Sequence, residues 1–295
     1  MPPHRPFAAL ALAVAIICVV SPVRAQTFPG YDDPFGPQAD LRFPTTPEPL
    51  RIEKDPRKAT TALFRPTDAG PFPAVIVMPD CGGAGESEFT WANKAVTNGY
   101  VALIVDPFKP RNAADDCTLP QKVSWPRRLK DAFDAVRHLR GLPFVRADKI
   151  ALMGFSTGGM TALEAASASS ARYSQSGNFA AIVAFYPYCD VAQTKRRFLP
   201  ALLSAPLLVL MGDLDTEMPP DTCRAPLNAL KAAGQPIDWE LFANATHCWD
   251  CVQYRAGGLR KRDWKGDPIE YRYNVDVTIA SQDRAFTFLA NYLGR

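Results

Sequence analysis

The apolar positions of this chain come in short runs that are separated by longer, amphipathic stretches. From residue 59 onward the runs are rich in Val, Ile, Leu and aromatic residues, and most contain no polar residue. Continuous apolar runs of this length are typical of strands that are buried on both faces of a parallel sheet. The predicted strands span residues 60–64, 74–78, 100–105, 150–153, 180–185, 207–211 and 237–242.

Between these runs, the sequence has longer patterns with the period of an amphipathic helix. Helices are expected at residues 86–98, 125–139, 158–168, 221–233 and 277–292. Strands that alternate with helices predict an α/β protein, with a mostly parallel central sheet and helices on both faces. No internal repeat or low-complexity block competes with that interpretation.

The first 50 residues do not follow this alternation. Residues 1–25 carry basic residues near the start, then an apolar run, then Val23-Arg24-Ala25, which predicts a secretory signal peptide. The apolar run is short for a membrane span, and a single uncleaved anchor is the alternative. Residues 26–50 contain six prolines and predict an extended arm. We therefore expect one domain over 51–295, in an exported protein that is periplasmic or secreted.

Charge and cysteine content narrow the choice of partner and compartment. The 33 basic and 30 acidic residues nearly balance, and loss of a leader that holds Arg5 and Arg24 lowers the net charge from +3 to +1. This balance gives no indication of a nucleic-acid partner. Cleavage after Ala25 also removes Cys18 and leaves six cysteines in a chain bound for an oxidising compartment. Up to three disulfides are expected, and fifteen pairings are possible.

The clearest chemical motif is Gly154-Phe155-Ser156-Thr157-Gly158-Gly159, which follows one predicted strand and opens a predicted helix. Glycines let the chain turn sharply, so that Ser156 projects at the top of the sheet beside a helix N-terminus. A serine in this setting is a candidate nucleophile. The alternative is a glycine-rich turn with a solvated serine.

A serine nucleophile needs a base within hydrogen-bond reach, and the chain has only three histidines. His4 belongs to the leader, and His138 lies in the helix before the nucleophile strand, on the wrong side of the sheet. His247 follows the last predicted strand, in a loop at the carboxyl end of the sheet, where ligands of open α/β sheets gather. Elimination assigns His247 as the base. A structural or zinc-binding histidine is the alternative, and without a second histidine nearby no metal site is expected.

The orienting acid of such a site comes between serine and histidine in chain order, just after a strand. Asp213 and Asp215 both follow the predicted strand 207–211, and Asp215 is favoured because it lies further into the loop. Two backbone N–H groups must also face the developing oxyanion. Thr157 supplies one, and Cys81, in the loop after the second predicted strand, is expected to supply the other, unless that loop is a plain glycine turn.

Together these residues resemble the dienelactone hydrolase family, over about residues 60–293. The family's elbow, G-x-C-x-G-G or G-x-S-x-G-G, is similar to residues 154–159. Its G-x-x-D acid motif is similar to residues 212–215, and its histidine to His247. The resemblance implies an α/β-hydrolase fold and a carboxylic ester hydrolase that needs no cofactor.

The resemblance also assigns further roles. Asp80 stands where the best-known member has a glutamate that interacts with its cysteine nucleophile. Arg111 is similar in placement to an arginine that holds the substrate carboxylate. A second arginine, four residues after the histidine, is absent here, and Cys251 occupies its position. With Ser156 in place of cysteine, this departure weakens the case for dienelactone itself as the substrate. By likeness to exported members, the implied disulfides are Cys81 with Cys117, Cys189 with Cys223, and Cys248 with Cys251.

The sequence therefore predicts an exported serine hydrolase that cleaves a small-molecule ester, thioester or lactone through an acyl-enzyme. Two other classes stay open. One is a non-catalytic binding protein on the same fold. The other is a thiol-disulfide protein that uses residues 248–251, although redox motifs of this spacing open a helix after the first strand of a thioredoxin-like unit. Lys109 and Arg111 hint at an anionic substrate or are simply solvated. The oligomeric state is not indicated.

Overall fold

The computed structural model describes residues 39–113, 117, 122–173, 177–191, 196–262 and 266–294. The predicted signal peptide and the first part of the predicted arm lie outside these residues. The rest of the arm, residues 39–50, contains no helix or strand. Its Leu41 and Phe43 side chains pack against the hydrophobic core, and Asp40 forms ion pairs with two basic residues of the helix that begins at Trp125. This part of the arm is therefore fastened to the folded unit.

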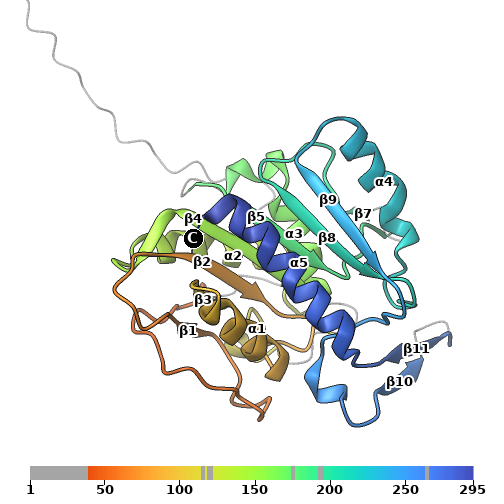
Figure 1. Ribbon diagram of the computed structural model, residues 1–295, viewed down its shortest axis with the longest axis horizontal. Coiled ribbons are helices and arrows are strands. Elements are labelled where there is room, and N and C mark those ends of the chain that lie inside the picture. Colours follow the sequence, from red (N-terminus) through yellow and green to blue (C-terminus); the bar gives the residue numbers. More distant parts are fainter. Residues whose placement is uncertain are drawn as a thin grey trace, which may run out of the picture. The chain divides into compact units, whose positions relative to one another are not determined.

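A seven-stranded sheet forms the centre of the folded unit (Figure 1). Its strands are β1 (Ala62–Phe64), β2 (Phe72–Met78), β3 (Val101–Ile104), β4 (Val145–Phe155), β5 (Ala181–Phe185), β8 (Leu207–Gly212) and β9 (Ile237–Phe242). In space they follow the order β1-β3-β2-β4-β5-β8-β9. Only β1 runs antiparallel to its neighbour among these seven; the other pairings are parallel. The carboxyl ends of the parallel strands therefore meet at one edge of the sheet.

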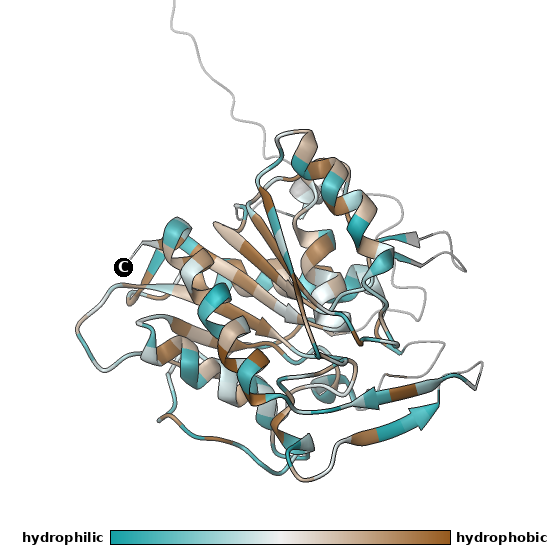
Figure 2. Ribbon diagram, turned by 45° about the vertical axis from the view of Figure 1, so that its right-hand side comes forward, coloured by the Kyte–Doolittle hydropathy of each residue, from teal (hydrophilic) through white to brown (hydrophobic). Residues whose placement is uncertain are grey.

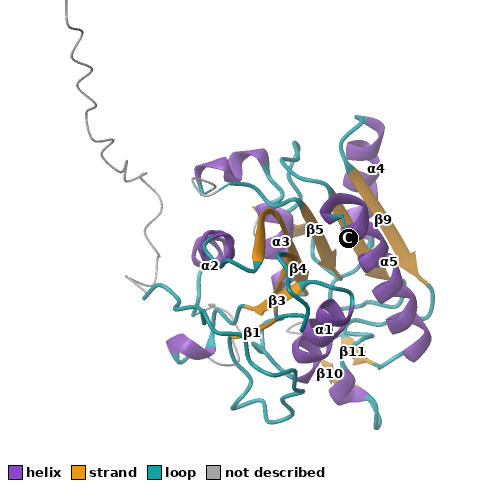
Figure 3. Ribbon diagram, turned by 60° about the vertical axis from the view of Figure 1, so that its left-hand side comes forward, coloured by secondary structure: helices purple, strands orange, loops and turns teal. Residues whose placement is uncertain are grey.

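Helices cover both faces of the sheet (Figure 3). They are α1 (Glu86–Thr97), α2 (Trp125–Arg140), α3 (Thr157–Ala165), α4 (Asp221–Ala232) and α5 (Val275–Leu293). Buried residues of α1 and α5 share one hydrophobic core, and those of α2, α3 and α4 share the other. Successive residues of β2 alternate between these cores. Ile76 packs in the core that α2, α3 and α4 share, and Val77 packs in the core that α1 and α5 share.

The hydropathy of the elements follows from this layering (Figure 2). The central strands are apolar along their length, whereas the covering helices carry both hydrophobic and hydrophilic residues. A strand with helices on both sides has no solvent-facing position, so every residue of β5 and β8 is buried. The uninterrupted apolar runs in the sequence are thus explained by burial on two faces.

The predicted α/β class, with its mostly parallel sheet, is confirmed. Each predicted strand and helix is present; β9 has the predicted bounds, and the others differ from the prediction at one or both ends. Two small antiparallel hairpins were not predicted: β6 (Asp190–Val191) with β7 (Arg196–Arg197), and β10 (Leu259–Arg262) with β11 (Pro268–Tyr271). β10 reads Leu-Arg-Lys-Arg and is mostly exposed, so it lacks the apolar pattern that marks a buried strand. Short 3-10 turns lie at Lys109–Arg111, Ala168–Arg172 and Val252–Tyr254.

No helix in the part of the chain that the structure describes is both long and apolar enough to cross a bilayer.

Candidate active site

Ser156 lies in the tight turn between β4 and α3, and glycines make that turn possible. Ser156 itself has φ 53° and ψ −113°, a conformation that a residue with a side chain rarely adopts. A Cβ on Gly154 would lie 2.1 Å from the carbonyl oxygen of Gly158, and a Cβ on Gly158 would lie 2.5 Å from those of Met78 and Pro79. The chain therefore passes so close to itself that only glycine fits on either side of the serine.

A chain of hydrogen bonds joins Ser156 to side chains from two other loops. His247 Nε2 lies 3.0 Å from Ser156 Oγ, and His247 Nδ1 lies 2.7 Å from Asp215 Oδ2. The three residues are 5%, 2% and 3% exposed in the order serine, histidine and aspartate. When Nδ1 carries a proton that it donates to the carboxylate, Nε2 is left to accept the serine proton. The fold thus brings together three residues that the sequence places far apart.

Asp215, and not Asp213, contacts the imidazole. Oδ1 of Asp215 accepts hydrogen bonds from the backbone N–H groups of Glu217 and Met218, at 3.0 and 2.8 Å, so that Oδ2 is left for the histidine. Asp213 instead accepts a bond from the backbone N–H of Ala245 at 3.3 Å. Of the two aspartates that follow β8, the first stabilises a turn and the second orients the histidine ring.

Carboxylates around His247 set its protonation. Burial alone would lower the pKa of His247, but the charge and hydrogen bond of Asp215, with the charges of Glu217 and Asp80, outweigh burial and raise the pKa above its ordinary value of 6.5. The imidazole is therefore a stronger base than a free histidine.

The loop after β2 approaches the elbow and is shaped by its own hydrogen bonds. Asp80 Oδ1 accepts from Gly82 N–H at 2.7 Å, and the Asp80 carbonyl accepts from Gly83 N–H at 3.2 Å. Asp106, fully buried at the end of β3, accepts from Ala84 N–H at 3.0 Å. Cys81 lies in the middle of this braced loop. Thr157 opens α3 directly after the serine, where a helix has N–H groups without intrahelical partners.

Three disulfides surround this edge of the sheet. They join Cys81 to Cys117, Cys189 to Cys223, and Cys248 to Cys251. These are the pairs that the family resemblance implied. The first holds the loop that contains the expected oxyanion donor, and the third closes the four residues directly after His247.

Comparison with known proteins decides the family. The sequence profile of the dienelactone hydrolase family matches residues 59–293. The chain belongs to the dienelactone hydrolase family.

Two of the relatives match smaller parts of the chain. A Bradyrhizobium protein named "probable 2-oxo-3-(5-oxofuran-2-ylidene)propanoate lactonase" is 32% identical over 159 residues, which are 52% of this chain and 63% of that protein. An Aspergillus aculeatus thiohydrolase is 32% identical over 95 residues, 32% of this chain and 29% of that protein. The chain thus spans less than two thirds of either relative.

Solved structures show the same fold. A dienelactone hydrolase-like promiscuous phosphotriesterase from metagenomic libraries superposes with a TM-score of 0.59, at 20% identity, over 79% of this chain and 92% of that one. An α/β hydrolase from a deep-sea metagenome superposes with a TM-score of 0.55, at 20% identity, over 76% and 86%. The α/β-hydrolase fold predicted for this family member is confirmed.

Arg111, which the resemblance placed at the substrate carboxylate, and Lys109, which hinted at an anionic substrate or a solvated loop, have other contacts in this chain. Arg111 forms a two-pronged ion pair with Asp131 of α2, at 2.7 and 2.8 Å, and also donates to the carbonyls of Ala39 and Pro107. The Lys109 amine donates to the carbonyl of Ala59 at 2.7 Å and to that of Ala84. Both cations therefore hold loops in place. The Arg111 side chain is only 5% exposed, and the Lys109 side chain is 14% exposed.

A buried network behind His247 was not predicted. The Tyr186 ring meets the His247 ring nearly edge-on, with centroids 4.7 Å apart. Its hydroxyl donates to Asp250 Oδ1 at 2.9 Å, while the Trp91 indole donates to Asp250 Oδ2 at 2.6 Å. Burial raises the pKa of Asp250 in spite of these two bonds. Tyr186 directly follows β5, so the sequence could have placed it at the carboxyl edge of the sheet. Nothing in the sequence indicates that Asp250 accepts hydrogen bonds from Tyr186 and Trp91.

A second unpredicted cluster lies in front of His247, on the β10–β11 hairpin. The Tyr271 ring lies 5.3 Å from the His247 ring between centroids, and the two residues form a parallel β-bridge. The Tyr271 hydroxyl donates to the Glu217 carboxylate, which also accepts from the Lys261 amine at 3.1 Å. Lys261 donates to the Tyr271 hydroxyl as well, at 2.7 Å. Glu217 thereby ties the hairpin to the loop that carries Asp215.

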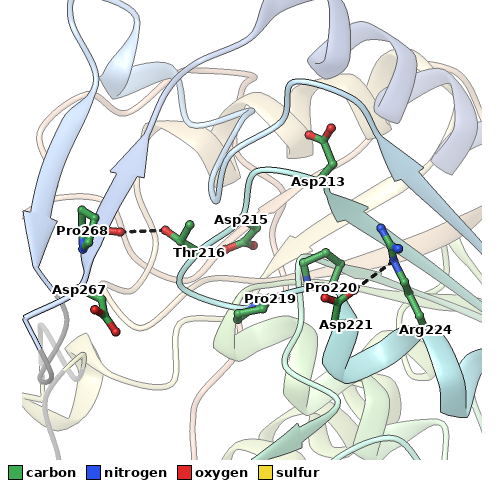
Figure 4. Close-up of a pocket in the computed structure, with 9 residues that line it drawn as sticks. All are labelled: Asp213, Asp215, Thr216, Pro219, Pro220, Asp221, Arg224, Asp267 and Pro268. Carbon is green, nitrogen blue, oxygen red and sulfur yellow. Dashed lines mark hydrogen bonds and ion pairs between the residues drawn. The ribbon is translucent and has the colours of Figure 1, made fainter.

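An open pocket of about 520 Å³ lies beside the Asp215 loop (Figure 4). In its wall, the Thr216 hydroxyl donates a hydrogen bond to the carbonyl of Pro268 at 3.1 Å. An ion pair joins Arg224 to Asp221. Asp213 and Asp267 add two more carboxylates to its wall. Within the described ranges, no group of three or more His, Cys, Asp or Glu side chains has the arrangement to hold a metal ion.

Proposed function

We propose that this chain is a serine hydrolase that cleaves a small ester, thioester or lactone through a covalent acyl-enzyme. The observation that carries the proposal is the buried, continuous hydrogen-bonded chain from Asp215 through His247 to Ser156. The glycine-bounded, strained turn supports it, because a structural serine needs no such conformation. Membership of the dienelactone hydrolase family and the lactonase and thiohydrolase names of two relatives support the same reaction class.

In the first half of the proposed reaction, His247 Nε2 takes the hydroxyl proton of Ser156 as Oγ attacks the carbonyl carbon. The carbonyl oxygen becomes an oxyanion, which the backbone N–H groups of Thr157 and Cys81 stabilise. Asp215 keeps the Nδ1 proton in place and stabilises the imidazolium that forms. The tetrahedral intermediate then collapses: the bond to the alcohol or thiol breaks, and His247 returns the proton to that leaving group.

In the second half, water replaces the alcohol. His247 removes a proton from water as its oxygen attacks the acyl carbon, a second tetrahedral intermediate forms, and the Ser156 ester bond breaks. The proton on His247 returns to Oγ. Every proton and electron pair in this sequence is accounted for by the three side chains and water, so the scheme requires no cofactor.

The contacts at the site also bear on the two competing classes, and residues 248–251 bear on the thiol-disulfide class. The sulfurs of Cys248 and Cys251 are joined to each other, and the two residues are 2% and 3% exposed. A thiol-disulfide exchange protein needs an accessible sulfur for attack. The burial of this pair favours a structural clip beside His247. The hydrogen-bonded chain from Asp215 through His247 to Ser156, together with the raised pKa of His247, favours a catalytic site over a binding protein without activity.

A fluorophosphonate probe tests the proposal directly, because it bonds covalently to activated serines. We expect the wild type to be labelled and Ser156→Ala to be unlabelled while it keeps its fold. The matched control is Ser169→Ala, which removes an exposed serine and should label normally. Aryl esters, thioesters and small lactones then define the breadth of the reaction. A folded wild-type protein that neither labels nor hydrolyses any of these would refute the proposal and favour the binding class.

We also propose that the protein is exported, with cleavage after Ala25. The three disulfides support this, because disulfides form and persist in oxidising compartments. Expression of the full chain in a Gram-negative host tests the proposal. We expect a periplasmic product that begins at Gln26, as read by N-terminal sequencing. Recovery of the uncleaved chain from the cytosol would contradict it.

A further inference from the structure

Among the described residues, three basic side chains near the carboxyl edge of the sheet are paired with acids or carbonyls. Arg111 is bound to Asp131, and Lys109 donates to two carbonyls. The third, Lys261 on the hairpin in front of His247, is bound to Glu217 and to the Tyr271 hydroxyl. A carboxylate on a substrate would have to displace an existing ion-pair or hydrogen-bond partner to reach any of these three cations.

Three carboxylates lie near the reacting groups, and the charge of each is felt at His247. Glu217 is two residues from Asp215, and it accepts the hydroxyl of Tyr271, whose ring faces the His247 ring. Asp80 immediately follows the Met78-Pro79 segment, whose carbonyls press against the nucleophile elbow. In the described ranges Asp80 has no ion pair, and its side-chain bond is to the N–H of Gly82 in its own loop. Asp215 adds a third negative charge.

The protonation of these acids agrees with their surroundings. Burial raises the pKa of Asp80, although the hydrogen bond from Gly82 and the charges of His247 and Lys261 act in the opposite direction. Burial acts on Glu217 in the same way, but the charges of His247 and Lys261 and the hydrogen bonds from Tyr271 and Lys261 outweigh it, so the pKa of Glu217 is lowered and its charged form is favoured. The charges of Glu217 and Asp80 both help to raise the pKa of His247, so each is felt at the imidazole. A negative group on a bound substrate would be exposed to the same repulsion.

We propose that this site selects against negative charge, so that its substrates are uncharged or cationic esters, thioesters or lactones. The inference rests on the proposed hydrolase function and names the substrate class of the same site. The pocket beside the Asp215 loop has the same acidic character, since four aspartates and a single arginine, which is paired with Asp221, line it. Glu217 is the residue that we hold most responsible, because it both neutralises Lys261 and lies next to the Asp215–His247 pair.

A matched series of acetate esters isolates charge from the acyl group. The leaving groups are 3-hydroxybenzoate, which is anionic, methyl 3-hydroxybenzoate, which is neutral, and 3-hydroxyphenyl-trimethylammonium, which is cationic. All three form the same acetyl-enzyme, so a difference in kcat/KM reports binding and acylation. Each value is divided by the rate of hydrolysis of that ester by hydroxide. We expect the anionic ester to be disfavoured against the neutral one by roughly tenfold, as one like charge several ångströms away predicts.

Two variants test whether Glu217 causes this preference. Glu217→Gln removes a negative charge and releases Lys261, so the anionic-to-neutral ratio should rise by roughly tenfold. Lys261→Met leaves Glu217 unpaired, so the same ratio should fall. The control, Asp148→Asn, removes an exposed charge from the far end of β4 and should leave the ratio unchanged. Raising ionic strength from 0.1 to 1 M should shrink the discrimination, because the Debye length falls from about 10 to about 3 Å.

The outcomes separate this inference from the function on which it rests. An anionic ester that is hydrolysed as well as or better than the neutral one would overturn the inference while the hydrolase stands. An unchanged ratio in Glu217→Gln would overturn the role of Glu217. Failure of all three esters, together with no labelling of Ser156 by the fluorophosphonate probe, would overturn the hydrolase itself.

Discussion

The reactivity that we propose for Ser156 depends on neighbours that have no side chain. Gly154 and Gly158 approach each other's backbone, and Gly158 also touches the carbonyls that end β2. This contact holds the serine in a left-handed conformation at the carboxyl edge. The strain is local, and the surrounding sheet and helix supply the free energy that maintains it.

Adding one methyl group to the elbow should therefore be costly. Gly158→Ala places a Cβ 2.5 Å from two carbonyl oxygens of the β2 loop, so we expect a loss of roughly 3 kcal/mol in the free energy of unfolding and a large loss of esterase activity. Urea unfolding and ester hydrolysis measure the two effects. Gly141→Ala, whose new Cβ would be 3.4 Å from its nearest neighbour, is the control. Equal stability of the two variants would contradict the close approach.

The environment of His247 predicts a pH profile. Neutral His247 is the active base, and its pKa lies above 6.5, so kcat/KM should fall as the pH is lowered, with a midpoint above 6.5. Glu217→Gln removes one of the charges that raise this pKa, and the midpoint should move to lower pH. Hydrolysis of the neutral aryl ester between pH 5 and 9 measures both midpoints. A shift to higher pH in the variant would be the wrong sign.

At the scale of elements, the loops at the carboxyl edge are held by ion pairs that reach back to the helices. Arg111, just after β3, is bound to Asp131 of α2 and to the carbonyl of Ala39 in the arm. Burial raises the pKa of Asp131 to about 6 even though Arg111 opposes the shift. The pair is therefore a buried contact between three segments, and its loss should be seen in stability.

Arg111→Met should lower the free energy of unfolding by roughly 3 kcal/mol, because it leaves a buried carboxylate without its partner. The loss should be smaller at pH 5 than at pH 8. An acid whose pKa is raised on folding contributes stability at low pH and loses it as the pH rises through the folded value. The double variant Arg111→Met with Asp131→Leu should recover most of the loss. A raised KM with unchanged stability would instead restore the predicted role in substrate binding.

For the whole molecule, covalent links reinforce the edge at which the site lies. The pairs Cys81–Cys117 and Cys189–Cys223 close loops of 36 and 34 residues, whereas Cys248–Cys251 spans three. Long loops restrict the unfolded chain most, so the two long pairs should contribute mainly to stability. The short pair should matter for the position of the His247 loop.

Replacing both cysteines of one long pair, or of the short pair, by serines should separate the contribution to stability from the contribution to the position of the His247 loop. Loss of Cys189–Cys223 should lower the free energy of unfolding by roughly 3 to 4 kcal/mol, and loss of Cys248–Cys251 by about 1.5 kcal/mol, from the dependence on loop length. Loss of the short pair should reduce kcat by the larger factor. Denaturant titration and ester hydrolysis of the two double variants measure this. The reverse order in stability would show that strain or residual structure outweighs loop length.

Much of the fold could be predicted because burial on two faces leaves a strong pattern. β5 and β8 are entirely buried, and their runs of apolar residues are unmistakable in the sequence. The β10–β11 hairpin was missed because β10 is mostly exposed and β11 is short and only half buried, and exposed strand positions are under no requirement to be apolar. The predicted site residues differ from the missed ones in whether their signal is local in the sequence. Ser156 has a local glycine signature, whereas Glu217 and Tyr271 meet only when two distant loops fold together.

The sequence alone determined the α/β class, the elbow around Ser156 and the elimination that selected His247. These depend on local backbone geometry, on burial and on a count of histidines. Only the tertiary structure decided that Asp215 and not Asp213 meets the imidazole, and that Arg111 is bound to Asp131. The physical reason is that a charge is neutralised by whatever lies within a few ångströms of it. That neighbour can come from any part of the chain, so the spacing of residues does not reveal it.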